Sequence, residues 1–202
     1  MHVWNLWRLY IYIDLAIQTA KNKGYKHIVL MGHSYGCNKI IYYYYQKHPD
    51  IIGIILASAP DMIGLQLLRQ KDYQELIKEA KENIDKSDGN KLVSNVIEDY
   101  MYMSSKTYYN WYNKNSNLDN LPVMGNSNNW DQFSIIDVLI LTFSGTEETD
   151  NYLHLDLLQK KAKKCPDFEY KYINGANHFY MNKENEISEL ILNWIRGRKK
   201  WK

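Results

Sequence analysis

The chain has 202 residues, of which 45% are hydrophobic and 24% charged, and its formal net charge is +2. This length and balance predict one globular domain, and so small a charge excludes a general attraction to nucleic acid or to an anionic membrane. Cys37 and Cys165 lie far apart, which excludes a disulfide framework and a paired-cysteine metal site and favours a cytoplasmic protein with reduced thiols.

The first predicted elements are a helix and a strand. Apolar residues recur at helical spacing over residues 6–17, which indicates an amphipathic helix. This segment carries Arg8 and Asp14 and lacks a small-residue cleavage site, so it is not a signal peptide, and no run in the chain is long enough to span a membrane. An apolar run at residues 27–31 then predicts a strand, and residues 37–47 predict a helix directly behind it.

Between that strand and helix lies the pentapeptide Gly32-His33-Ser34-Tyr35-Gly36. A serine flanked in this way by two glycines, at a sharp strand-to-helix turn, is typical of a nucleophile elbow. The turn forces Ser34 into a strained backbone conformation, and the glycines leave room for the close strand and helix. The Tyr35 N–H lies at the N-terminus of the helix and can bind a developing oxyanion. We therefore predict Ser34 as a nucleophile and Tyr35 as an oxyanion donor.

The rest of the chain predicts a parallel sheet with flanking helices. Apolar or alternating runs indicate strands at residues 51–57, 138–143 and 168–173, and helical patterns occupy residues 152–164 and 184–198. Strands that alternate with helices over short connections define a single α/β domain.

One interval, residues 61–133, is too long for a crossover connection. It contains helical patterns at residues 73–83, 92–103 and 104–112 and an asparagine-rich irregular stretch at residues 113–129. We interpret it as a helical lid inserted into a core of residues 1–60 and 134–202, since long insertions between sheet strands commonly cover a site.

A serine nucleophile needs an imidazole base and a carboxylate that orients it. His178 lies in a loop just after the last predicted strand, on the sheet edge where the elbow opens and where sites of parallel sheets assemble. His154 lies in a predicted helix and is the competing candidate, whereas His33 sits inside the elbow and is expected to point away from Ser34. We predict His178 as the general base.

The acid is expected between the nucleophile and the base in the chain. Glu148 stands three residues after Gly145, in the loop behind the strand at residues 138–143. We favour Glu148 as the acid, with Glu147, Asp150 and Asp61 as open alternatives. No motif predicts a metal site or nucleic-acid binding.

With these positions identified, the chain resembles the α/β-hydrolase superfamily, and in particular small serine esterases of the feruloyl-esterase-like and related branches. The resemblance covers nearly the whole chain and is carried by residues 24–36, 55–61, 143–148 and 175–178. It implies Ser34 as nucleophile, Glu148 as acid and His178 as base. It also implies hydrolysis of small-molecule carboxylic esters through an acyl-enzyme, without a cofactor. Glu148 departs from the aspartate that is more usual in these esterases.

Members of that superfamily place further strands and a second oxyanion loop before the elbow. Only 33 residues precede Ser34 here, and none of them resembles that loop. We therefore expect an N-terminally truncated sheet with an unpaired apolar edge at residues 28–31, through which the chain self-associates. Two alternatives remain: a catalytically impaired remnant that acts as a binding domain, and a peptidase or acyltransferase with the same triad.

Overall fold

The computed structural model describes residues 6–98, 101–148 and 154–197. In chain order its elements are α1 (Leu6–Asn22), β1 (Val29–His33), α2 (Tyr35–Lys47), β2 (Gly53–Ala57), α3 (Met62–Arg69), α4 (Tyr73–Asp85), α5 (Ser105–Tyr112), α6 (Asp131–Ser134), β3 (Leu139–Gly145), α7 (Leu155–Lys161), β4 (Phe168–Ile173) and α8 (Glu184–Arg196). The predicted α/β class is confirmed. Within the described ranges, no helix is both long and apolar enough to cross a membrane.

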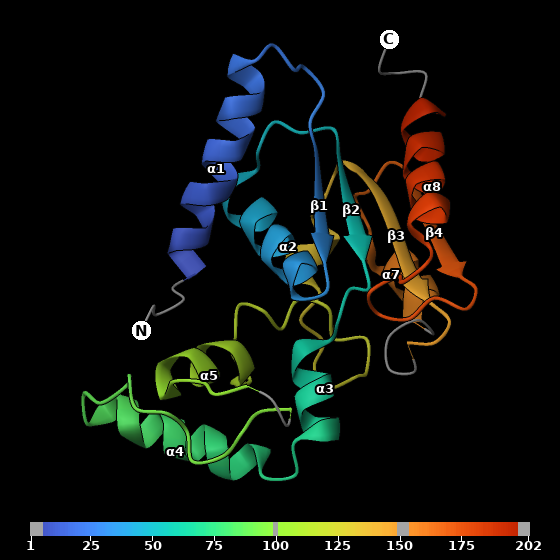
Figure 1. The fold of residues 1–202 in the computed structure, drawn as a ribbon. Helices are drawn as coiled ribbons and strands as arrows, with labels where there is room; N and C mark the ends of the chain where they lie inside the picture. The colour runs from blue at the N-terminus through green and yellow to red at the C-terminus, as the bar shows by residue number, and fades with distance from the viewer. Residues whose placement is uncertain (1–5, 99–100, 149–153, 198–202) are drawn as a thin grey trace.

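The four strands form one parallel sheet in the order β1-β2-β3-β4. Met31 pairs with Ile55, Ile55 with Leu141, and Leu141 with Glu169. Because all strands run in the same direction, their carboxyl ends lie side by side along one edge, the carboxyl edge of the sheet, where the arrows of Figure 1 end. Residues that follow different strands are therefore brought together in space, although they lie far apart in the sequence.

Helices cover both faces of the sheet. Ile54 and Ile140 face a core that is completed by side chains of α1, α2, α6 and α7. Ile55 and Leu141 face the opposite way and pack with Trp194 of α8. This alternation along β2 and β3 produces a three-layer domain (Figure 1). Each fully buried aliphatic side chain of this kind contributes roughly 1.5–3 kcal/mol to folding.

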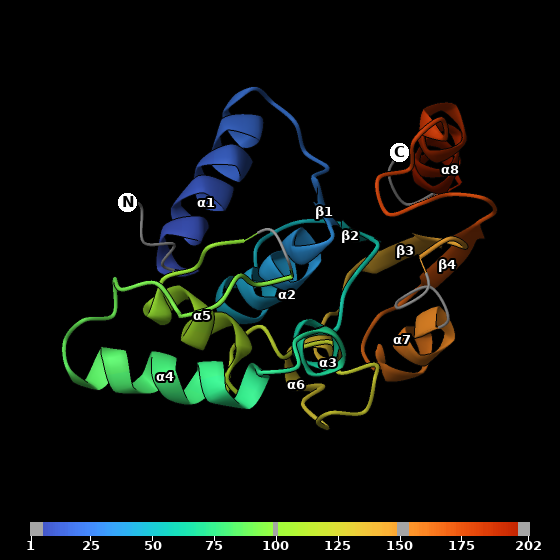
Figure 2. The ribbon, with the colours of Figure 1, turned by 60° about the horizontal axis from the view of Figure 1, so that its bottom comes forward.

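A second group of helices, α3, α4 and α5, lies beyond the carboxyl ends of the strands (Figures 1 and 2). It has an apolar core of its own, in which Leu76, Ala80 and Tyr108 are almost fully buried. We call residues 62–112, which contain these three helices, the cap. The cap stands over the edge at which the predicted site residues converge; its action as a lid stays a prediction.

The expected helix at residues 92–103 is wrong. The chain there forms two isolated antiparallel bridges, Leu92 with Ser104 and Ile97 with Met101. Ile97 is fully buried in the cap core, so packing against α4 and α5 outweighs the helical spacing of the apolar residues. The sequence prediction also missed α3, whose first turn is capped by the Asp61 carboxylate, which accepts a hydrogen bond from the Gly64 N–H.

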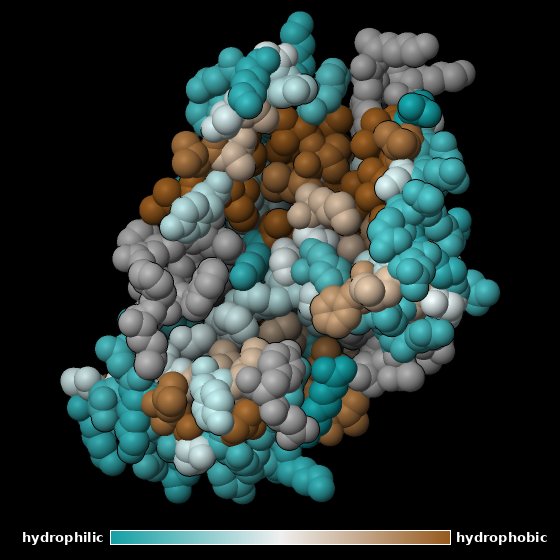
Figure 3. Space-filling model, viewed as in Figure 1, coloured by the Kyte–Doolittle hydropathy of each residue, from teal (hydrophilic) through white to brown (hydrophobic). Residues whose placement is uncertain are grey.

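Among the described strands, β1 pairs with β2 alone and forms an edge of the sheet. Met31 on this strand is 50% exposed. Figure 3 shows apolar side chains gathered in the hollow between α1 and α8. The expected apolar edge is present in the described sheet, and self-association through it stays a prediction.

Candidate active site

The turn from β1 to α2 has the geometry of a nucleophile elbow. Ser34 has φ 54° and ψ −132°, a conformation that is strained for a residue with a side chain. A Cβ on Gly32 would lie 2.6 Å from the carbonyl carbon and oxygen of Gly36, so only glycine fits there. The expectation that both glycines make room is wrong for Gly36, because among the described atoms its Cβ would meet nothing within 4 Å.

The helix behind the elbow presents its amides at the same point. Tyr35 is the first residue of α2, so its N–H is one of the amides that an α-helix leaves without an intrahelical partner. The positive end of the helix dipole lies here, and the first turn of α2 carries no acidic side chain that would neutralise it. This arrangement suits an oxygen that acquires negative charge beside Ser34.

His178 joins the elbow to the carboxylate. Its Nε2 lies 3.0 Å from the Ser34 Oγ, and its Nδ1 lies 2.7 Å from the Glu148 Oε2. The carboxylate assigns the proton to Nδ1, which leaves the lone pair of Nε2 facing the serine hydroxyl. The three predicted residues therefore form one continuous chain of hydrogen bonds.

Glu148 is buried, with 7% of its surface exposed. Its Oε1 accepts hydrogen bonds from the Gly145 N–H at 2.7 Å and from the Ser58 hydroxyl at 2.6 Å. Burial raises the pKa of this carboxyl, but the hydrogen bonds from His178, Ser58 and Gly145 outweigh burial and hold the pKa below its usual value. The carboxylate is therefore ionised at neutral pH.

The other candidates are placed differently. Glu147 is exposed and lines a pocket in front of Ser34. Asp61 caps α3 and accepts a hydrogen bond from the Met124 N–H at 2.9 Å, and burial raises its pKa to about 6. His154 lies at the N-terminus of α7. Asp150 lies outside the described residues.

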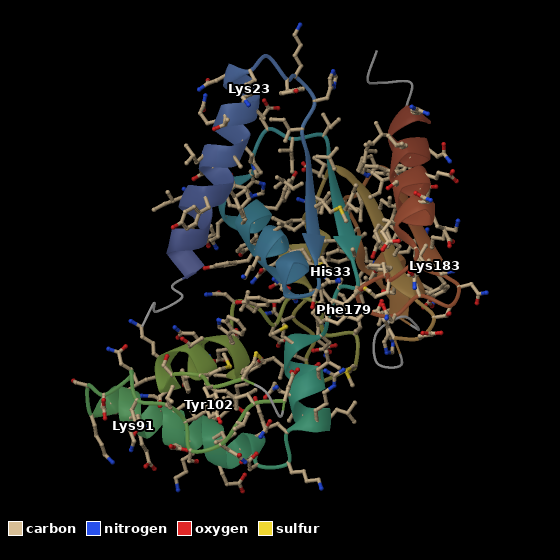
Figure 4. All side chains as sticks on the ribbon, in the orientation of Figure 1. Lys23, His33, Lys91, Tyr102, Phe179 and Lys183 are labelled. Atoms are coloured by element: carbon tan, nitrogen blue, oxygen red, sulfur yellow. The ribbon has the colours of Figure 1, made fainter. Side chains whose placement is uncertain are left out.

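His33 makes a contact that the sequence did not reveal. Its Nε2 lies 2.8 Å from the carbonyl oxygen of His178, and the two imidazole rings are 4.9 Å apart. Figure 4 labels His33 and Phe179, which lie close together where β1 meets the loop after β4. His33 thus ties the backbone of the loop that carries His178 to the elbow.

A pocket of about 570 Å³ opens in front of the serine. The sheet edge contributes Ser34, Tyr35, His178 and Glu148, and the cap contributes apolar walls from Met62, Leu65, Met101, Trp111 and Tyr112. The Trp111 indole stacks on the Tyr35 ring, with 4.1 Å between the ring centres. Arg69 and Glu98 form an ion pair of 3.6 Å in the same lining. In the described ranges, no group of three or more His, Cys, Asp or Glu side chains is arranged to hold a metal ion.

A parallel sheet with an elbow after one strand and a histidine and a carboxylate after later strands defines the α/β-hydrolase fold. Solved structures agree with this fold. The monoacylglycerol lipase of Paleococcus ferrophilus superposes with a TM-score of 0.63 at 20% identity, over 95% of this chain and 75% of the lipase. Est1E of Butyrivibrio proteoclasticus, solved with ferulic acid, gives 0.62 at 13% identity, over 96% and 69%. A soluble variant of the Saccharomyces cerevisiae monoglyceride lipase gives 0.62 at 18% identity, over 93% and 67%.

The chain belongs to the protein family DUF1749, described as a protein of unknown function, whose family model matches residues 9–195. No curated protein matches the sequence significantly. At these identities the solved structures establish the fold of this family member and not its chemistry.

Proposed function

We propose that this protein is a serine hydrolase that cleaves carboxylic esters of small molecules through an acyl-enzyme. The observation that carries the proposal is the chain of hydrogen bonds from Ser34 through His178 to Glu148, with distances of 3.0 Å and 2.7 Å. The esterases and lipases that share the fold add support at the level of the class.

In the proposed reaction, the Ser34 Oγ attacks the ester carbonyl while the His178 Nε2 takes the hydroxyl proton. The tetrahedral intermediate collapses when His178 returns that proton to the leaving alcohol, which leaves the acyl group on Ser34. Water then attacks the acyl-enzyme, with His178 again as base, and the carboxylic acid and the free serine are released. Glu148 holds the imidazole in the reactive tautomer and stabilises its positive charge throughout.

The carbonyl oxygen becomes negative in both tetrahedral intermediates. In this proposal it binds the Tyr35 N–H, where the helix dipole of α2 adds to the hydrogen bond. The apolar cap wall, with Met62, Leu65 and Trp111, favours an uncharged acyl or aryl group as the part of the substrate that enters the pocket.

The deciding experiment treats the purified protein with a fluorophosphonate probe, which forms a covalent bond with an activated serine. Wild type is compared with Ser34→Ala, and Ser144→Ala serves as a control in which a different serine hydroxyl is removed. We expect an adduct in wild type and in the control and none in Ser34→Ala, with the same pattern in the hydrolysis of short-chain nitrophenyl esters.

Two outcomes count against the proposal. A folded wild type that forms no adduct contradicts an activated serine and favours the binding-domain alternative. An adduct without ester hydrolysis favours peptidase or acyltransferase chemistry with the same triad, because that chemistry shares the nucleophile.

A further inference from the structure

Ser58 follows β2 directly and lies at the sheet edge, between the elbow and the loop that carries Glu148. It is fully buried and has φ 50°, in the left-handed region that non-glycine residues rarely adopt. Its N–H donates to the Phe143 carbonyl at 2.8 Å, which fixes this conformation. A residue with a side chain keeps such a conformation only where its surroundings hold it there.

The hydroxyl lies between two oxygens. The Ser58 Oγ is 2.6 Å from the Glu148 Oε1 and 2.5 Å from the Tyr180 hydroxyl oxygen, and that tyrosine oxygen is 3.1 Å from the Phe143 carbonyl. Each hydroxyl has one proton. The ionised carboxylate is the strongest acceptor, so the Ser58 proton points to Glu148. A contact of 2.5 Å between two hydroxyl oxygens needs a proton between them, so the Tyr180 hydroxyl donates to Ser58 in preference to the more distant Phe143 carbonyl.

We propose that Tyr180 and Ser58 form a chain of two donors that positions the carboxylate of Glu148, so that both are positioning residues of the triad. This inference rests on the proposed function, since it assigns roles around the same acid. The two donors and the carboxylate that accepts from them come from the ends of different strands: Ser58 follows β2, Glu148 follows β3, and Tyr180 lies two residues after His178 in the loop behind β4. The same loop thus carries the base and the outermost donor.

The chain of donors has a specific electrostatic effect. The titratable groups that interact with the carboxylate are His178 and Tyr180 from the loop after β4 and Cys37 from α2. Glu147, the residue before Glu148 in the sequence, lines the same pocket. Without the Ser58 hydroxyl, one oxygen of the buried carboxylate keeps the Gly145 N–H as its remaining donor, and the carboxylate binds a proton more tightly. Protonation of the Glu148–His178 pair would then remove activity at a higher pH than in wild type.

The test measures the rate of fluorophosphonate labelling against pH in four single variants and one double variant. Ser58→Ala removes the hydroxyl and keeps the strain, Ser58→Gly removes the hydroxyl and the strain, and Tyr180→Phe removes the outer donor. Ser144→Ala is the matched control, because Ser144 is a buried serine in the same region whose Oγ has no hydrogen-bond partner among the described residues.

We expect both Ser58 variants to label roughly tenfold more slowly below neutral pH, with the acidic limb of the profile moved to higher pH. Tyr180→Phe should shift the limb less, and the double variant Ser58→Ala/Tyr180→Phe should match Ser58→Ala, because Tyr180 acts through Ser58. Ser144→Ala should leave the limb in place. A loss of rate that is equal at all pH values, or additive effects of the two residues, would overturn the proposal.

A second readout separates this inference from the proposed function. This readout is the NMR resonance of the proton between the His178 Nδ1 and the Glu148 Oε2. We expect this resonance to change in Ser58→Ala but not in Ser144→Ala. If wild type forms no adduct, the proposed function fails, and the NMR comparison still decides whether Ser58 acts on the carboxylate.

Discussion

Replacing Gly32 with alanine adds one methyl group at the point where the elbow is most crowded. The new Cβ would lie 2.6 Å from the carbonyl carbon and oxygen of Gly36 and 2.7 Å from the Cys37 nitrogen, where ordinary contacts begin at 3.4 Å. The strand end and the first turn of α2 must therefore separate by about 0.8 Å. All three atoms belong to the backbone, so no side-chain rotation relieves the overlap. We expect a cost of about 2–4 kcal/mol in folding free energy.

The same shift moves the Ser34 hydroxyl relative to His178, and a displacement approaching 1 Å commonly lowers a rate by about 10²-fold. Thermal unfolding of Gly32→Ala should show a Tm lower by roughly 5–10 °C, and its fluorophosphonate labelling should fall by two orders of magnitude. Gly36→Ala is the control, since a helical alanine with free space should change stability by less than about 1 kcal/mol, in the favourable direction. Wild-type Tm and labelling in Gly32→Ala would refute this reasoning about the elbow.

Three further predictions concern the surroundings of the serine. Glu148→Gln should lower kcat by roughly 10³–10⁴-fold because the imidazole loses its charged partner, whereas Glu147→Gln should change it little, and steady-state ester hydrolysis tells the two apart. Burial raises the pKa of Asp61 from 3.8 to about 6, so the folded protein keeps a proton that the unfolded chain releases, and stability falls as pH rises from about 4 to 6. Urea unfolding of wild type should show that the free energy of unfolding falls from about pH 4 to about pH 6. The same fall in Asp61→Asn would contradict the assignment of this pH dependence to Asp61. Trp111→Ala should raise KM for aryl esters roughly tenfold with a smaller effect on kcat, since it removes one apolar wall of the pocket.

Local patterns predicted the sheet and its flanking helices well. The apolar runs of β2 and β3 are continuous because both faces of these strands are buried, which gives a signal that does not depend on distant parts of the chain. The cap was harder. Residues 92–103 have helical spacing, but Ile97 and Met101 pair in an antiparallel bridge because the cap core accepts them in that arrangement. The Asp61 side chain just before α3 was the available signal for that helix, as an N-cap.

In the candidate site too, some features were predictable from the local sequence and others depended on the fold. The convergence of Ser34, His178 and Glu148 was predictable because each follows a strand, and strand ends of a parallel sheet meet; their catalytic roles stay a proposal. Ser58 also follows a strand and met the same criterion, yet a lone serine carries no chemical signal until its distance to the carboxylate is known. Tyr180 is 122 residues from Ser58 in the sequence, and the contact between their hydroxyl groups depends on the path of the loop after β4.

Residues from two parts of the fold line the pocket, and substitutions in the two parts have different effects on it. The proposed reacting groups stand on loops fixed by the sheet, whereas Met62, Leu65 and Trp111 stand on the cap, which has a core of its own. Changes at Met62 and Leu65 can therefore reshape the pocket while the hydrogen bonds around Ser34 stay unaltered, whereas Trp111 stacks on Tyr35 and is coupled to the elbow. Under the proposed function, new substrate preferences can arise by substitution on α3 alone, which makes this helix the natural target for redesigning selectivity.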